Sequence, residues 1–194
     1  SSAANPLPES CRARLGETER AVELFQTVAE QEPSDRLAAE AYFEAGLLRY
    51  QQADYGSAAA FFRALLRNYP NSARVGDAHY WLGNAYLVEE SLHRALTAYN
   101  QAVARDAAPD SLLVEVRFQK AWVQYEDGRY AQAAPDFLSV VENHPDTPRG
   151  REALFWGADS HYQRGNLGRA RTLFRRYLRD NPDGRHVAGR PGCR

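Results

Sequence analysis

The side chains that could take part in chemistry are few and scattered along this sequence. The five histidines are His79, His93, His144, His161 and His186. None of them forms a paired-histidine motif, and neither of the two cysteines has a second cysteine three residues away. Structural metal sites and thiol redox sites are built from such close pairs. The sequence therefore predicts neither a metal site nor a cofactor.

A catalytic triad is suggested only by the run Asp159-Ser160-His161. Adjacent residues in a helix point in different directions, so this serine and histidine cannot form the contact that activates a nucleophile. The sequence also contains no glycine-rich loop of the kind that binds phosphate groups. We therefore expect a protein that is not an enzyme.

The overall composition narrows the classes of partner. The chain has 194 residues, of which 25% are charged, and its formal net charge is -1. Nucleic-acid-binding domains are usually basic, so no nucleic acid is expected as a partner. No stretch approaches the roughly 20 apolar residues that cross a bilayer, so contact with a membrane is expected only through partners. The chain begins at Ser1 and contains no methionine, which indicates a processed protein or an excised fragment.

The charges are unevenly distributed along the chain. Residues 1–60 carry ten acidic and five basic side chains, whereas residues 164–194 carry nine arginines and only two aspartates. In an elongated molecule this distribution produces a charge dipole along the long axis.

A long repeat provides the elements that must position these side chains. Five times, an alanine is followed four residues later by an aromatic residue, and the alanines are 37, 37, 38 and 37 residues apart. These pairs are Ala21/Phe25, Ala58/Phe62, Ala95/Tyr99, Ala133/Phe137 and Ala170/Phe174. A fixed period of this length indicates one helix-turn-helix unit that is copied and stacked.

The breaks between units are also regular. Proline is followed two residues later by a hydroxyl side chain in Pro70-Asn71-Ser72, Pro109-Asp110-Ser111 and Pro145-Asp146-Thr147. Proline cannot continue a helix, and serine or threonine is a favourable N-cap for the next one. The sequence thus predicts an all-α solenoid in which each unit contains two helices.

These residues resemble the tetratricopeptide repeat. One copy carries Leu82-Gly83, Tyr86, Ala95 and Tyr99; another carries Gly128, Tyr130, Ala133, Phe137 and Pro145; a third carries Gly165, Ala170, Phe174 and Pro182. The period of 37 residues and the Tyr69-Pro70-Asn71-Ser72 junction are similar to a long-period bacterial subgroup. That subgroup includes proteins of the periplasmic Tol-Pal system and of the outer-membrane β-barrel assembly machine. The resemblance implies a right-handed superhelix.

We expect the solenoid to span residues 16–183. Its predicted parts are a half repeat at 16–33, which contributes one capping helix from about residue 17, and full repeats at about 36–70, 73–109, 111–145 and 148–182. Residues 1–15, which contain Pro6 and Pro8, are expected to be irregular, and 184–194 are expected to form a flexible tail.

The resemblance also implies a binding surface, because the first helices of such units line a concave groove. The side chains that would face a ligand are Phe43, Tyr50, Asp77, Tyr80, Asn84, Glu115, Phe118, Trp122, Tyr125, Glu152, Phe155, Asp159 and Tyr162. This ladder of aromatic residues with carboxylates at its rim favours a peptide with apolar anchors and some positive charge.

The same aromatic residues could instead belong to the core, because their spacing of three and four residues is also that of a packing seam. Both alternatives remain open from the sequence. Trp122 stands where a small or polar residue is usual, so it is the strongest candidate for ligand contact. Trp81 and Trp156 could seal the junction with a neighbouring unit.

The last predicted helix, about 167–181, forms a possible second patch. Its arginines are Arg169, Arg171, Arg175, Arg176 and Arg179. They suit the solvated outer face of a terminal repeat, but they could also bind an acidic protein, an anionic lipid or glycan, or RNA.

These observations predict a scaffold or adaptor that binds a protein or peptide in its groove. From the resemblance alone, its place is the bacterial periplasm and its role envelope assembly, while a cytoplasmic location stays open. Two alternatives remain: a self-assembling structural scaffold, and a recognition module cut from a larger protein.

Overall fold

The computed structural model describes residues 9–31, 35–104 and 110–181, and every regular element within these ranges is a helix. The helices are α1 (Glu9–Gln31), α2 (Asp35–Gln51), α3 (Tyr55–Asn68), α4 (Val75–Val88), α5 (Leu92–Ala104), α6 (Asp110–Glu126), α7 (Tyr130–Asn143), α8 (Pro148–Gln163) and α9 (Leu167–Asp180). The expected all-α repeat solenoid is confirmed.

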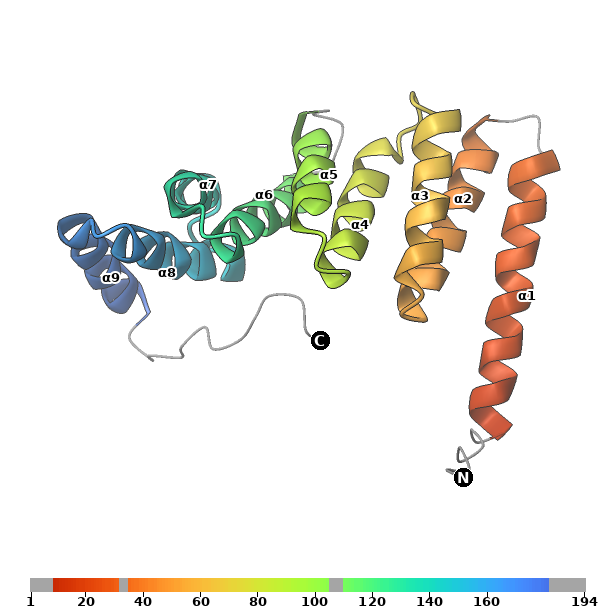
Figure 1. Cartoon of the computed structure of the whole chain (residues 1–194), viewed down its shortest axis with the longest axis horizontal. Coiled ribbons are helices and arrows are strands. Elements are labelled where there is room, and N and C mark those ends of the chain that lie inside the picture. The colour runs from red at the N-terminus through yellow and green to blue at the C-terminus, as the bar shows by residue number, and fades with distance from the viewer. Residues whose placement is uncertain (1–8, 32–34, 105–109, 182–194) are drawn as a thin grey trace.

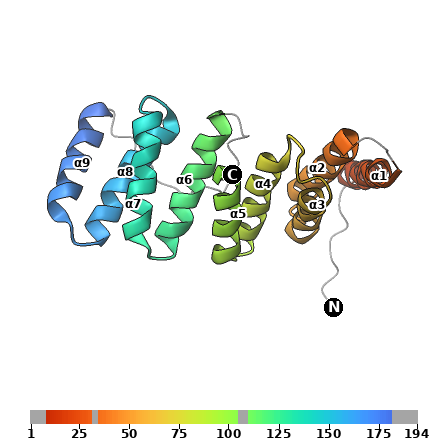
Figure 2. The ribbon, with the colours of Figure 1, turned by 90° about the horizontal axis from the view of Figure 1, so that it is seen from above.

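The helices form an elongated row, with α1 at one end and α9 at the other (Figure 1). Each helix packs against the next one along the chain, and α2, α4, α6 and α8 also contact one another in sequence. Within the described ranges, α3, α5, α7 and α9 make no equivalent contacts with one another. Seen from above, the same order is preserved along the whole row (Figure 2). Because the even-numbered helices are the more crowded, they lie on the inside of the curve. We call their common surface the inner face.

In each of the four full units, a turn with the same hydrogen-bond pattern connects the two helices. A residue with positive φ stands in every turn: Ala53 (61°), Glu90 (56°), Gly128 (70°) and Gly165 (75°). In each case its N–H donates to the carbonyl three residues earlier, and the next N–H donates to the carbonyl five residues earlier, as in Glu90 to Leu87 and Ser91 to Tyr86. This pair of backbone hydrogen bonds is the Schellman motif, which ends a helix and satisfies its last carbonyl groups.

The core is divided into two clusters of buried side chains. The first extends over α2 to α5 and includes Val116 and Val123 of α6, and the second extends over α6 to α9. In three of the full units the repeated aromatic residue lies at the centre, whereas Phe174 in the last unit is half-buried. Phe62, Tyr99 and Phe137 are completely buried. A Cβ added at Gly83 would lie 2.5 Å from the ring of Tyr99, so only glycine allows this close approach.

The N-terminal helix is longer than the sequence suggested. It begins at Glu9 and not near residue 17, so the expectation of an irregular segment is wrong for residues 9–15. The physical reason is that Pro6 and Pro8 precede Glu9, and no proline interrupts the chain from there to Gln31. Helix α1 is joined to α2 by Arg49, which donates to both carboxylate oxygens of Glu19 at 2.6 and 2.8 Å. The other predicted irregular residues, 1–8, and the predicted tail, 184–194, lie outside the described residues.

The inner face of the solenoid

Three of the aromatic residues predicted to face a ligand are instead part of the core. Phe43 is 4% exposed, Phe118 is completely buried and Trp122 is 4% exposed. Phe43 packs against Phe62, and Phe118 packs edge-on against Phe137 with ring centroids 5.4 Å apart. The groove interpretation is therefore wrong for these three residues, and the packing-seam alternative holds for them.

Trp122 is buried because a neighbouring unit covers it. Its indole stacks on Tyr125 at 5.6 Å and meets the edge of Trp156 at 4.7 Å. Trp156 also meets Tyr125 at 5.2 Å, and Trp81 makes the corresponding contact with Tyr50, 5.0 Å between centroids. Trp81 and Trp156 thus lie at contacts between units, which the sequence left as one possibility.

The remaining predicted aromatic residues keep some exposed surface on the inner face. Tyr50, Tyr80, Tyr125 and Phe155 are half-buried, whereas Tyr162 is 56% exposed. Burial raises the pKa of Tyr50 to about 12, and it also raises the pKa of Tyr80 above its usual value. These hydroxyl groups therefore stay protonated to a higher pH than an exposed tyrosine, and that of Tyr80 is hydrogen-bonded with Asn84.

The carboxylates of the inner face are held by two arginines that the sequence analysis did not single out. Arg149, at the start of α8, donates to both oxygens of Glu115 on α6 at 2.6 and 2.7 Å, and it also donates to Glu152. Arg74 donates in the same way to Glu40 on α2 and to Asp77, at 3.0 Å. We call each such group an arginine clamp.

Each clamp also covers a buried ring. The guanidinium carbon of Arg74 lies 4.6 Å from the ring centroid of Phe43, and that of Arg149 lies 4.5 Å from Phe118. A cation placed over an aromatic face is attracted by the negative charge of the ring surface. The clamps therefore close the core on its inner side while they join neighbouring first helices.

A sequence signal for the clamps exists, but its period is twice that of the repeat. Arg74 and Arg149 are 75 residues apart, and the same offset relates five further pairs. These are Glu40/Glu115, Phe43/Phe118, Tyr50/Tyr125, Asp77/Glu152 and Trp81/Trp156. The pattern of contacts thus repeats every two units.

The junction between α4 and α6 has neither an arginine clamp nor a tryptophan between the units. Leu112 occupies the place of the clamp arginine, three residues before Glu115, and Gln119 occupies the place of the junction tryptophan. Gln119 is 5% exposed and donates to Glu115 at 2.9 Å. Among the described residues, no arginine joins Asp77 to Glu115. The inner face therefore consists of two clamped pairs of units with an unclamped junction between them.

Polar side chains near the aromatic residues are also fixed by hydrogen bonds. Asn84 accepts from the Tyr99 hydroxyl at 2.6 Å, and Asp159 accepts from the Tyr125 hydroxyl and from Gln163. The Ser160 hydroxyl donates to the backbone carbonyl of Trp156 at 2.7 Å. Ser160 is thus committed to its own helix and is not positioned as a nucleophile.

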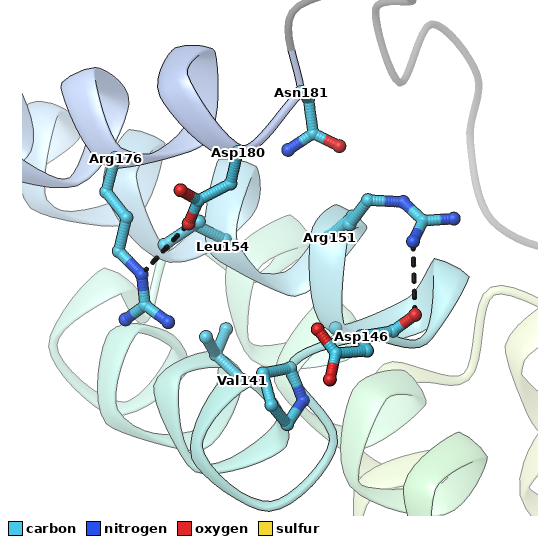
Figure 3. Close-up of a pocket in the computed structure, with 9 residues that line it drawn as sticks. Val141, Asp146, Arg151, Leu154, Arg176, Asp180 and Asn181 are labelled. Atoms are coloured by element: carbon cyan, nitrogen blue, oxygen red, sulfur yellow. Dashed lines mark hydrogen bonds and ion pairs between the residues drawn. The ribbon is translucent and has the colours of Figure 1, made fainter.

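The five arginines of the possible second patch are all exposed on α9. Arg176 and Arg179 share Asp180, at 3.4 and 3.1 Å, so their charge is partly balanced. A hollow of about 220 Å³ lies beside them, between α9 and the turn that precedes α8 (Figure 3). Its charged lining contains Arg151 and Arg176 together with Asp146 and Asp180. Since the two signs are balanced, this hollow does not select an anion.

Two further features bear on the possible chemistry. In the part of the chain that the structure describes, no group of three or more His, Cys, Asp or Glu side chains is arranged to hold a metal ion. Within the same ranges, none of the helices combines the length and apolar character needed to span a bilayer.

A family model described as "Tetratricopeptide repeat" matches the chain over residues 12–73, 74–111 and 118–185. Among curated proteins, the cell division coordinator CpoB of Pseudomonas putida is 38% identical over 61 residues. This match covers 31% of the chain and only 23% of CpoB, so the two proteins share one segment and not their whole length.

Solved structures with the same arrangement include YrrB, described as a TPR protein with an unusual peptide-binding site. Its TM-score is 0.69 at 24% identity, over 90% of this chain and 84% of YrrB. MamA has a TM-score of 0.70 at 15% identity, over 93% and 98% of the two chains. A tetratricopeptide repeat protein from Parabacteroides merdae has a TM-score of 0.67 at 17% identity, over 89% and 63%. At these identities the likeness shows the fold alone.

Proposed function

This chain belongs to the tetratricopeptide repeat family, and from that premise we propose that it is a non-enzymatic scaffold that binds a protein or peptide partner on its inner face. Proteins built from stacked helical repeats typically act by presenting an extended concave surface to a partner. A preformed surface also lowers the ordering cost of binding, because only the partner segment has to become fixed.

The observation that carries this proposal is the composition of the accessible part of the inner face. Among the described residues, five carboxylates, Glu40, Asp77, Glu115, Glu152 and Asp159, stand beside three arginines, Arg36, Arg74 and Arg149. Half-buried rings and the exposed Tyr162 lie among them. Aromatic anchors next to an excess of negative charge favour a segment that carries apolar side chains and positive charge.

The proposed setting is the assembly of the bacterial envelope, with the protein in the periplasm. This part of the proposal is supported by the similarity of one 61-residue segment to a cell division coordinator. A cytoplasmic scaffold would use the same surface, so the experiment compares both compartments.

The test is affinity capture from periplasmic and cytosolic extracts of the source bacterium, with the native chain and two variants as bait. Asp77→Asn/Tyr162→Ala removes one charge and one exposed ring from the inner face. Glu142→Gln, on the exposed side of α7, removes one charge elsewhere and serves as the control. Circular dichroism confirms that all three baits are folded.

We expect a periplasmic protein that is captured by the native chain and by the control, and whose yield falls at least about tenfold with the inner-face variant, a loss of about 1.4 kcal/mol of binding free energy. Equal capture by all three baits would contradict the inner face as the binding site. Capture of a partner from the cytosolic extract alone would support the scaffold function but contradict the proposed role in envelope assembly.

A further inference from the structure

The unclamped junction between α4 and α6 retains every part of an arginine clamp except the arginine. In a clamp, the guanidinium binds a carboxylate of the preceding first helix, binds a second carboxylate three residues after the arginine, and covers an aromatic ring. The corresponding residues at the unclamped junction are Asp77, Glu115 and Tyr80. Leu112 stands in the place of the arginine and offers neither charge nor a hydrogen-bond donor. Helices α4 and α6 lie in the middle of the row, so described units flank this junction on both sides (Figure 1).

The two carboxylates of this junction have the hydrogen-bonding capacity that a third guanidinium requires. A carboxylate offers about four acceptor sites. Among the described residues, Asp77 uses one of them, for Arg74. Glu115 uses three, two for Arg149 and one for Gln119. A clamp arginine places two bonds on the carboxylate of the preceding helix and one on the second carboxylate. Asp77 can accept the first two, and Glu115 can accept the last.

Gln119 provides a further acceptor in the same place. It is 5% exposed, and its side-chain nitrogen donates to Glu115 at 2.9 Å, so its amide group lies beside that carboxylate. Its oxygen Oε1 is buried and has no hydrogen-bond partner among the described residues. Buried acceptors in proteins are nearly always paired, because an unpaired one is unfavourable. The junction therefore lacks a hydrogen-bond donor as well as a positive charge, and a guanidinium supplies both.

The charges around this place are only partly balanced. Each of the two flanking clamps holds one arginine against two carboxylates. The side chains of Asp77 and Glu115 are 21% and 23% exposed, so a ligand can reach both. Burial is the main cause of the raised pKa of Tyr80, and the negative charge of Glu115 on the neighbouring helix adds to it. The ring and the two carboxylates therefore form one site across α4 and α6.

We propose that an arginine side chain of the partner segment completes a third clamp at this junction, with its guanidinium over Tyr80 and bound to Asp77 and Glu115. The inference rests on the proposed function, since it takes the occupant to belong to a segment on the inner face. Arginine is favoured over lysine, because its planar group holds five N–H donors in a fixed arrangement, whereas an ammonium group is a point charge. The two existing clamps show that equivalent surroundings bind a guanidinium.

The test is an NMR titration of the isotope-labelled full chain with N-acetyl-arginine methylamide as the probe. The corresponding lysine and citrulline compounds are the comparison probes, and citrulline keeps the shape of arginine without its charge. The side-chain N–H groups of Gln119 report directly, because they lie in the site. Their signals are identified by their absence from the spectrum of Gln119→Met.

Two arginine substitutions make a matched pair for this titration. Leu112→Arg supplies the missing arginine from the chain itself, at the position that Arg74 and Arg149 hold in the clamped junctions. Leu37→Arg is the control, because Leu37 has the equivalent position in the first full unit and is 53% exposed. Arg105 lies outside the described residues, so Arg105→Gln tests whether the chain already fills the site with this side chain. Circular dichroism confirms the fold of each variant.

We expect the arginine probe to shift the Gln119 side-chain signals with a dissociation constant of the order of 1 mM, as suits so small a ligand. The lysine probe should bind about tenfold more weakly, and the citrulline probe should cause no specific shift. Leu112→Arg should weaken binding of the arginine probe at least about tenfold, whereas Leu37→Arg should bind it like the native chain. Used as bait in the affinity capture, Leu112→Arg should lose the partner to a similar degree.

Three results would overturn the inference. The first is a native chain whose Gln119 signals do not respond specifically to arginine, including the case in which only Arg105→Gln responds. The second is equal binding of the probe by Leu112→Arg and Leu37→Arg. The third is a partner that the native chain and Leu112→Arg capture equally, which would leave the proposed function standing without a third clamp. Arginine-specific binding at Gln119 with no captured partner would support the guanidinium site and contradict the proposed function.

Discussion

Arg149 on α8 binds Glu115 on α6 through two hydrogen bonds of 2.6 and 2.7 Å, across 34 residues of sequence. The contact joins the first helices of two units directly, without the second helix that lies between them in the chain. It also places the guanidinium over Phe118, in the core of the unit that contains Glu115. One side chain therefore joins two units and covers a core.

Replacement of Arg149 tests the energetic role of the clamp. Arg149→Ala removes the bonds to Glu115 and Glu152 and the cation over Phe118, so we expect a loss of about 1–3 kcal/mol in the free energy of unfolding. Arg149→Lys keeps the charge but not the paired hydrogen bonds, and should recover only part of this loss. Arg151→Ala, at an exposed neighbour, should stay within about 0.5 kcal/mol. Urea denaturation measures all three, and equal effects at Arg149 and Arg151 would refute the clamp.

Substitutions at two of the turns between paired helices should change the stability of the protein in opposite directions. Glu90 has a φ of 56°, a conformation that costs a residue with a side chain about 1 kcal/mol and costs glycine little. Glu90→Gly should therefore stabilise the protein by up to about 1 kcal/mol. Gly128→Ala, at the equivalent turn with a φ of 70°, should destabilise it by a similar amount. Thermal unfolding checks the pair, and a shared sign would contradict the assignment of strain to these turns.

Stability is expected to fall at both extremes of pH. Burial raises the pKa of Tyr50 to about 12, above the usual value near 10 in the unfolded chain. The folded state therefore holds this proton more tightly, so the stabilisation is complete below pH 10 and is lost as the pH rises through 12. Denaturation at increasing pH, together with tyrosinate absorbance, follows this loss, and Tyr50→Phe should reduce it. The difference in tyrosinate absorbance between the native chain and Tyr50→Phe isolates this one group, and a difference that appears near pH 10 in the folded protein would contradict the burial argument.

At acid pH the relevant group is Glu40. Its hydrogen bonds from Arg74 lower the pKa of the carboxyl below its usual value near 4.5. The stabilisation is present above that value and is lost as the pH falls through the lowered pKa. Glu40→Gln should flatten the acid side of the stability profile. An unchanged slope in that variant would show that Glu40 does not contribute.

The division of the core predicts two cooperative units. Phe137 is completely buried in the second cluster, and Phe137→Ala should cost about 3–5 kcal/mol there. Because repeat proteins are stabilised mainly by neighbouring contacts, hydrogen exchange should accelerate in α6–α9 far more than in α2 and α3. Phe62→Ala, in the first cluster, should instead accelerate hydrogen exchange in α2 and α3 far more than in α8 and α9. Uniform acceleration in both variants would indicate a single cooperative core.

The fold could be predicted because its signal is redundant. The pair Ala58/Phe62 recurs in phase in five copies, so a single degenerate copy does not obscure the period. The clamps could not be predicted in this way, because Glu40 and Arg74 belong to different units and their contact depends on how two helices are offset in space. The sequence suggested acidic side chains facing a ligand; the structure shows Asp77, Glu115 and Glu152 held by arginine, and Asp159 held by Tyr125 and Gln163.

The sequence could not decide between groove and core for a related reason. Phe118 and Tyr80 occupy equivalent positions, yet one is completely buried and the other half-buried. The difference is set by the neighbouring unit: Arg149 covers Phe118, whereas the unclamped junction leaves Tyr80 partly open. Spacing within one helix contains no information about that neighbour.

The period of 75 residues limits how a protein of this kind can grow. Clamped junctions alternate with the unclamped junction that contains Leu112 and Gln119. Duplication of a single unit would break this alternation, because two junctions of the same kind would follow one another. Duplication of two consecutive units reproduces both kinds of junction in the correct order. A segment of two consecutive units therefore contains one junction of each kind.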